Sequence, residues 1–172
     1  MLKVKSLQDL VKKPLANSVR GVCYRIVKDK ILSDYDYADE VTLNTNQKIY
    51  DFIIDKLNLI NEFDNVSVQE VAGFVVLNHA LKPIGFFAPF KGGIASTIMD
   101  TEMVVFSAIS LLGYAVVIFH SHPSGNPTPS DADVKLTTKV QTALSYFDIR
   151  LIDHMILTPN NKGSKFSSVP II

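Results

Sequence analysis

The chain has 172 residues, of which 47% are hydrophobic and 20% charged, and its formal net charge is zero. This length suits one domain with a full core, or one domain with an N-terminal elaboration. No apolar run reaches the roughly 18 residues that a membrane helix needs, and residues 1–5 lack the apolar region of a signal peptide. We therefore expect a soluble cytoplasmic protein without a membrane partner.

The charges are unevenly distributed along the chain. Residues 1–30 contain eight Lys or Arg and two acids, whereas residues 31–70 contain nine acids and two lysines. Two interpretations stay open: a solvated surface with internal charge pairing, or a basic N-terminal region that binds an acidic partner or nucleic acid. The single cysteine, Cys23, excludes an intramolecular disulfide and is expected to be a small strand or core residue.

Periodicity and capping residues predict three elements in the N-terminal part of the chain. They are a short helix at 6–14, a strand at 19–27, and an amphipathic helix at 46–59 that Asn44, Thr45 or Asn46 can cap. The polar segment 61–65 is the expected boundary. It divides an N-terminal elaboration, 1–65, from a core domain, 66–172.

The core domain alternates strands with helices, as α/β proteins do. Strands are predicted at 71–77, 84–90, 114–119, 149–157 and 164–168, and helices at 101–112 and 131–147. The run 114–119 is continuously apolar, so we expect a central strand buried on both faces. The helix 101–112, which Asp100 can cap, is apolar almost all round and is expected to be buried against the sheet.

Two histidines follow the central apolar run. In an extended segment, residues two apart face the same way, so His120 and His122 can reach one ion. The loop 122–129, rich in Pro and Gly, turns the chain back, and Ser130 then begins a helix with Asp133 in its first turn. Two neutral imidazoles and a carboxylate suit Zn²⁺ and leave a fourth position for water. The spacing predicts that His120, His122 and Asp133 hold zinc.

The order His-x-His, seven residues, Ser-x-x-Asp resembles the JAMM (MPN-type) zinc metalloproteases. Other segments resemble the bacterial RadC-like branch of that superfamily, over about residues 68–168. These are His-Pro-Ser-Gly-Asn at 122–126, Pro129-Ser130, Leu136-Thr137, Leu151-Ile152-Asp153-His154, and Gly92-Gly93-Ile94 with Thr97 and Asp100. The branch usually has Asn where this chain has Ser121. The resemblance implies an α/β fold of the JAMM/MPN type, similar to cytidine deaminases, with a mixed sheet flanked by helices.

The resemblance also implies a general base. Zinc lowers the pKa of a bound water to about 7, but a side chain must accept the proton and deliver it to the leaving group. Glu70, at the start of the strand 71–77, matches the catalytic Glu of the family. Taken alone it reads as an exposed acidic residue after a loop, and Glu102 and Glu62 are the alternatives.

For three further residues, two roles are possible. Ser130 can cap the helix that it begins, and the matching Ser of the family helps to hold an oxyanion. Asp153 and His154 match the branch, and either support the metal site or pack within the sheet.

The expected function is that of a zinc-dependent peptidase or isopeptidase, acting on a protein or peptide that lies as an extended strand near the sheet edge. Metallo-β-lactamase-like sites need an Asp-His soon after the His-x-His, and amidohydrolases need a longer barrel. The alternatives are a DNA-associated RadC-like protein and a partner-binding module that keeps the zinc fold. The zero net charge and the lack of a helix-hairpin-helix region in these residues argue against the DNA-associated protein. An intact base argues against the partner-binding module. The oligomeric state stays open.

Overall fold

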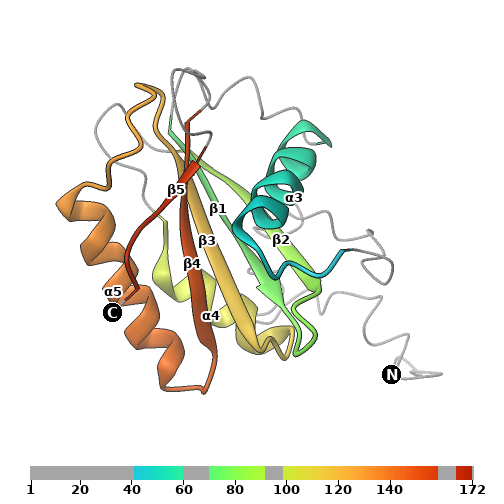
Figure 1. Cartoon of the computed structure of the whole chain (residues 1–172). Coiled ribbons are helices and arrows are strands. Elements are labelled where there is room, and N and C mark those ends of the chain that lie inside the picture. The colour runs from blue at the N-terminus through green and yellow to red at the C-terminus, as the bar shows by residue number, and fades with distance from the viewer. Residues whose placement is uncertain (1–40, 60–69, 92–98, 159–165, 172) are drawn as a thin grey trace, which may run out of the picture.

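A five-stranded mixed sheet lies between two layers of helices in the computed structural model, which describes residues 41–59, 70–91, 99–158 and 166–171 (Figure 1). The strands are β1 Val71–Leu77, β2 Pro83–Lys91, β3 Ala115–Ser121, β4 Arg150–Leu157 and β5 Phe166–Ser168, and the helices are α3 Asn46–Leu59, α4 Thr101–Ser110 and α5 Asp131–Ser145. The strand order is β2-β1-β3-β4-β5. Only the β3–β4 pair is parallel among these neighbours. The predicted α/β class, with a mixed sheet flanked by helices, is confirmed.

Every strand and helix predicted within the described residues is present. The helix 46–59 and the strand 71–77 have their predicted bounds, and the other elements differ at their ends. The helix predicted at 6–14, the strand at 19–27 and the boundary at 61–65 lie outside the described residues. None of the helices in the described part of the chain is both long and apolar enough to cross a bilayer.

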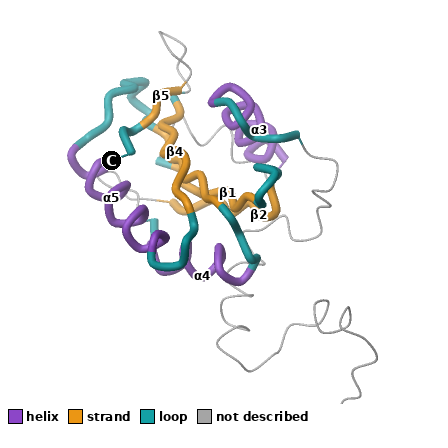
Figure 2. Tube along the Cα trace, turned by 60° about the horizontal axis from the view of Figure 1, so that its bottom comes forward, coloured by secondary structure: helices purple, strands orange, loops and turns teal. Residues whose placement is uncertain are grey.

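Helix α3 covers one face of the sheet, while α4 and α5 cover the other (Figure 2). The Thr45 hydroxyl accepts a hydrogen bond from the Lys48 amide at 3.3 Å, as an N-cap does. The apolar side chains of α3 are spaced three or four residues apart, and they pack on side chains of β1, β2 and β3. The contributors from α3 are Ile49, Phe52, Ile53 and Leu57. The amphipathic helix expected at 46–59 therefore buries its apolar face against the sheet.

Helix α4 buries only a stripe of its surface. Asp100 caps it by accepting a hydrogen bond from the Glu102 amide, as predicted. Val104 and Ala108 pack with residues of α5 and the sheet. The helix is buried against the sheet as predicted, but on one side only: Ile109 is 40% exposed, and Leu111 and Leu112, just past its end, are 38% and 89% exposed. A helix in an outer layer can bring only one side against a sheet.

Strand β3 is fully buried and supplies both faces of the core, as its apolar run predicted. Side chains alternate along it. Val117 and Phe119 join the cluster under α3, whereas Val116 and Ile118 join the cluster under α4 and α5. By the same alternation, His120 belongs to the face that α4 and α5 cover.

The short edge strand β5 holds three distant segments together. The Ser168 hydroxyl accepts a hydrogen bond from the Asn46 side chain at 3.0 Å and donates one to the Asp153 carboxylate at 3.2 Å. The neighbouring Ser167 hydroxyl donates to the Pro127 carbonyl at 2.5 Å. Strand β5 thus connects the start of α3, the middle of β4 and the loop after β3.

The packing of α3 predicts that alanine substitution destabilises the protein to different extents at two adjacent isoleucines. Ile53→Ala, at a fully buried position, should lower the free energy of unfolding by about 2–5 kcal/mol. Ile54→Ala, at a partly buried position, should cost clearly less. Urea unfolding of both variants measures the difference. Equal costs, or a larger cost at Ile54, would contradict the described face of α3.

Candidate metal centre

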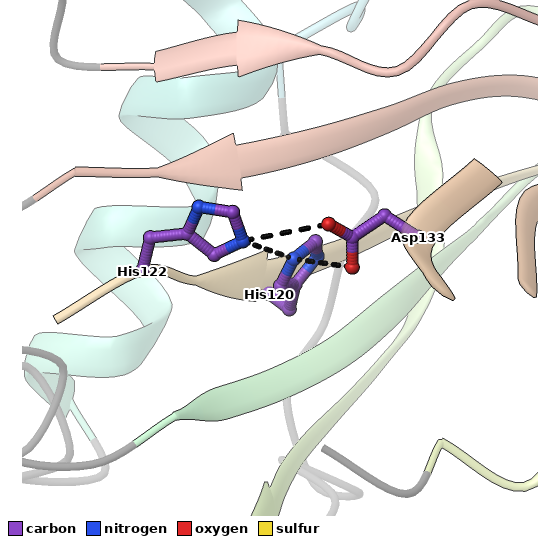
Figure 3. Close-up of side chains that lie close together, drawn as sticks. All are labelled: His120, His122 and Asp133. Carbon is purple, nitrogen blue, oxygen red and sulfur yellow. Dashed lines mark hydrogen bonds and ion pairs between the residues drawn. The ribbon is translucent and has the colours of Figure 1, made fainter. Parts of the chain in front are cut away.

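The two histidine side chains converge at the C-terminal end of β3 (Figure 3). His120 lies within β3, and the His122 amide donates to the Leu157 carbonyl at 2.9 Å, so pairing with β4 continues past the end of the strand. The Nε2 atoms of His120 and His122 are 2.9 Å apart. The prediction that residues two apart place both imidazoles on one side is confirmed.

Asp133 completes the cluster from the first turn of α5. Its Oδ1 lies 3.1 Å from His120 Nε2, and its Oδ2 lies 3.6 Å from His122 Nε2. All three potential ligand atoms lie within 4.8 Å of one another. Zn–N and Zn–O bonds of 2.0–2.2 Å place tetrahedral ligand atoms about 3.3 Å apart, so these residues fit a zinc ion. The structure brings His120, His122 and Asp133 together as predicted.

The contacts of His122 indicate which of its nitrogens is available. Its Nδ1 lies 2.7 Å from the Asn126 carbonyl oxygen. A carbonyl oxygen only accepts hydrogen bonds, so Nδ1 carries the proton in that contact. The lone pair of the neutral ring is then on Nε2, the atom that faces His120 and Asp133. The Asn126 carbonyl was not identified from the sequence, because a backbone contact leaves no side-chain signal.

Ser130 caps α5 and also orients the Asp133 carboxylate. The Ser130 hydroxyl accepts a hydrogen bond from the Asp133 amide at 3.2 Å and donates one to Asp133 Oδ2 at 2.7 Å. The Ser130 amide donates to the same oxygen at 2.7 Å, which completes a capping box. The predicted cap is present. The oxyanion role stays a prediction, and it requires the hydroxyl proton to turn away from Asp133.

Charge at the centre is concentrated on the carboxylate. Burial acts to raise the pKa of Asp133, but the contact with His120 and the hydrogen bonds from Ser130 outweigh it, so the net pKa is lowered. Burial, followed by the neighbouring His120, lowers the pKa of His154 to about 3. At neutral pH, Asp133 is therefore ionised and His154 is neutral. An anion next to two imidazole nitrogens is a suitable environment for a cation.

Extending the β1–β3 ladder predicts the face on which Glu70 lies. It directly precedes β1, where Ala72 pairs with His120 in the antiparallel ladder. Continuing this register by two residues brings Glu70 opposite His122, and alternation puts both on the same face. Glu70 is half-buried and is not among the clustered ligand atoms. This position agrees with a base near the ion, but the role itself stays a prediction.

Ser121, the departure from the RadC-like pattern, connects this region to β3. Its side chain is fully buried, and its hydroxyl accepts a hydrogen bond from the Val71 amide at 2.9 Å. The residue between the two histidines thus anchors the first residue of β1, immediately after Glu70. A short hydroxyl side chain is sufficient for this contact.

A register shift in β4, just before Asp153, decides which faces of the sheet Asp153 and His154 take. Val116 pairs with Leu151, but Val117 pairs with Asp153, so Ile152 is an extra residue in β4. Asp153 consequently faces α3, where it binds Ser168 and where burial raises its pKa. His154 faces the metal centre.

His154 contacts a metal-centre histidine directly. It is fully buried, and its Nε2 lies 2.8 Å from His120 Nδ1. Its Nδ1 lies 2.6 Å from the Thr137 hydroxyl on α5. Of the two interpretations left open for these matching residues, support of the site applies to His154 and packing within the fold applies to Asp153. The role of Thr137 was missed, since helix spacing alone cannot show which strand residue it meets.

Comparison with known proteins identifies a family that this chain matches. A family model described as a RadC-like JAB domain matches residues 43–168, a range that includes α3. A UPF0758 protein of Porphyromonas gingivalis is 35% identical over 99 residues, which are 58% of this chain and 43% of that protein. Another, of Clostridium perfringens, is 26% identical over 150 residues, or 87% and 61% of the two chains. This chain spans about half the length of the curated relatives that it matches.

The capping box predicts a local stability effect. Ser130→Ala should lower the free energy of unfolding by about 1 kcal/mol, because the Asp133 amide loses its side-chain acceptor. Ser145→Ala is the matched control at the other end of α5, where the exposed hydroxyl bonds only to the carbonyl of Thr142 among the described contacts. Chemical denaturation of both variants measures the difference. An equal effect at the two positions would contradict the cap.

Proposed function

This chain belongs to the RadC-like JAB domain family, and we propose that it is a zinc-dependent hydrolase of peptide or isopeptide bonds. One observation carries the proposal: the ligand atoms of His120, His122 and Asp133 meet within 4.8 Å at the end of the central strand. The names of the UPF0758 relatives specify no reaction. Support for the activity therefore comes from the chemistry of the site.

The three side chains would hold zinc through two imidazole nitrogens and one carboxylate oxygen, and leave a fourth position for water. When bound, zinc supplies a Lewis acid that polarises a carbonyl and lowers the pKa of water to about 7. The protein supplies the orientation. Ser130 fixes the Asp133 carboxylate, and the Asn126 carbonyl fixes the ring of His122.

Glu70 is the proposed general base. Its place at the start of β1, on the same face as His120 and His122, is the support for this role. A carboxylate there would accept the proton of the attacking water and pass it to the leaving amine. Ser130 would donate to the oxygen that becomes negative at the scissile carbonyl, once its hydroxyl turns from Asp133.

The proposed substrate is an extended segment of a protein or peptide. Strand β5 is a short edge strand, and Ser167 connects it to the loop that follows His122. An edge strand has backbone groups available for pairing with another strand. A peptide placed there would lie close to the metal centre. Nucleic acid is the competing substrate, and the basic region that suggests it lies outside the described residues.

The ligand set predicts one zinc ion per chain. Purified protein reconstituted with zinc and freed of excess metal should contain about one equivalent by elemental analysis. His122→Ala removes an imidazole ligand and should lose the metal. His79→Ala removes a histidine that stacks on Tyr114 instead, and should retain it. Metal content near zero in the wild type, or unchanged content in His122→Ala, would contradict the ligand assignment.

Replacing the proposed base predicts loss of turnover without loss of zinc. Glu70→Gln keeps the shape of the side chain but cannot accept a proton, so the rate should fall by about 10²–10⁴-fold. Glu102→Gln tests the alternative base in the first turn of α4 and should leave the rate nearly unchanged. Zinc content is measured beside activity for both variants.

The substrates for this assay are isopeptide-linked conjugates, a peptide library and labelled DNA, offered in parallel to the zinc-loaded protein. Cleavage of a peptide or isopeptide bond that depends on Glu70 supports the proposal. Cleavage of DNA alone would favour the nucleic-acid alternative. If Glu70→Gln loses its zinc, then Glu70 is a ligand or a structural residue, and the proposed mechanism is wrong.

A further inference from the structure

The hydrogen bonds behind His120 determine where its proton lies. The Thr137 hydroxyl lies 2.6 Å from the carbonyl oxygen of Asp133 and donates to it. Two oxygens this close need a proton between them, and the carbonyl has none to give. The single hydroxyl proton is therefore committed to the Asp133 carbonyl.

The commitment of that proton defines the tautomer of His154. Its Nδ1 lies 2.6 Å from the same Thr137 oxygen. Because the hydroxyl has no second proton, Nδ1 must be the donor in this contact. Full burial keeps the ring neutral, so the one proton of His154 is on Nδ1 and its Nε2 has a lone pair.

The same logic applies to His120. Its Nδ1 lies 2.8 Å from His154 Nε2, which can only accept. His120 Nδ1 therefore carries the proton, and the lone pair of the neutral ring is on Nε2. That atom is the one that lies 3.1 Å from Asp133 Oδ1 and 2.9 Å from His122 Nε2.

We propose that Thr137 and His154 are positioning residues that fix the proton of His120 on Nδ1 and so keep its Nε2 free to bind the metal ion. This inference deepens the proposed function and rests on it for the identity of the ion. We call the two side chains the Thr137–His154 relay. The relay begins at the backbone of one proposed ligand, Asp133, and ends at the ring of another, His120. It thereby connects α5 to β3 through β4.

The register shift in β4 turns His154 toward His120 and so makes the relay possible. If the register of Val116 with Leu151 continued unshifted, His154 would pair with Phe119, whose side chain faces α3. With the shift, His154 pairs with Ile118 and faces the centre. A bulge next to a site, with a buried polar side chain as its product, indicates a functional use of the irregularity.

The tautomers can be measured without any substitution. In zinc-free full-length protein at about pH 8.5, roughly two units above the ordinary imidazole pKa, nitrogen NMR of the histidine rings should show His120 and His154 protonated at Nδ1. Protonation of His120 at Nε2 in the wild type would overturn the relay, whether or not the protein hydrolyses anything.

Substitution of Thr137 tests whether the relay serves the ion. Thr137→Val keeps the shape but removes the acceptor for His154, so zinc affinity measured by competition with a chelator should fall about 10–100-fold. The rings of His120 and His154 should also lose their single tautomer. Thr137→Ser keeps the hydroxyl and should restore both properties.

Thr138→Val is the matched control. Thr138 is the next residue of α5, and its hydroxyl also donates to the carbonyl four residues earlier, here Val134, without contacting a histidine in the described contacts. Its substitution should change zinc affinity by no more than about twofold. If Thr137→Val and Thr138→Val lost zinc affinity equally, the cause would be a less stable helix, and the relay would be overturned.

The two proposals fail in different ways. If the wild type hydrolyses none of the substrates but binds zinc with the predicted dependence on Thr137, the proposed function fails and the relay stands. If Glu70→Gln abolishes hydrolysis while Thr137→Val retains wild-type zinc affinity, the relay fails and the function stands. A wild type that binds no zinc overturns both.

Discussion

Each nitrogen of a buried imidazole needs a hydrogen-bonding or metal partner, and this constraint organises the metal centre. His120 is 4% exposed and His154 is fully buried, so water does not satisfy their rings. The carbonyls of Asn126 and Asp133, together with the Thr137 hydroxyl, take up the outer contacts. The lone pairs that remain converge on one point beside a carboxylate.

The fold provides the setting in which these contacts are strong. Strand β3 is buried along its whole length and is paired on both sides, so the two histidines project from a rigid element. Hydrogen bonds in such surroundings are electrostatically stronger than in water, and an unpaired polar group costs correspondingly more. The same burial that stabilises the apolar core therefore restricts the orientation of the rings.

Local spacing made much of the site predictable from sequence. His120 and His122 are separated by one residue in an extended segment, and Asp133 falls in the first turn of a helix whose cap is readable as Ser130. Each of these inferences uses only the geometry of a single element. Relating Glu70 to the histidines needs the pairing of two strands, so the resemblance to a family suggested it from the sequence. Extending the β1–β3 ladder by two residues then points to a place opposite His122.

The remaining features depend on tertiary pairing, which spacing within a single element does not predict. Asp153 and His154 matched the family together, and alternation puts adjacent strand residues on opposite faces. A one-residue register shift decides that His154, and not Asp153, faces the metal centre. Leu112 is exposed because it lies just past the end of α4, and its apolar side chain gives no sign of this. Thr137 looks like an ordinary helix residue until β4 brings His154 against it.

The contacts of β5 have a consequence for the order of folding. Ser167 binds the Pro127 carbonyl 40 positions earlier, and Ser168 binds Asn46 across 122 positions. Contacts across such separations carry a larger loop-closure entropy cost than local contacts, which favours their late formation. During synthesis, the loop between His122 and Ser130 therefore cannot gain this anchor until β5 has left the ribosome. A chain that stopped before β5 would keep the three ligand residues but would lack the hydrogen bond that anchors the loop between them.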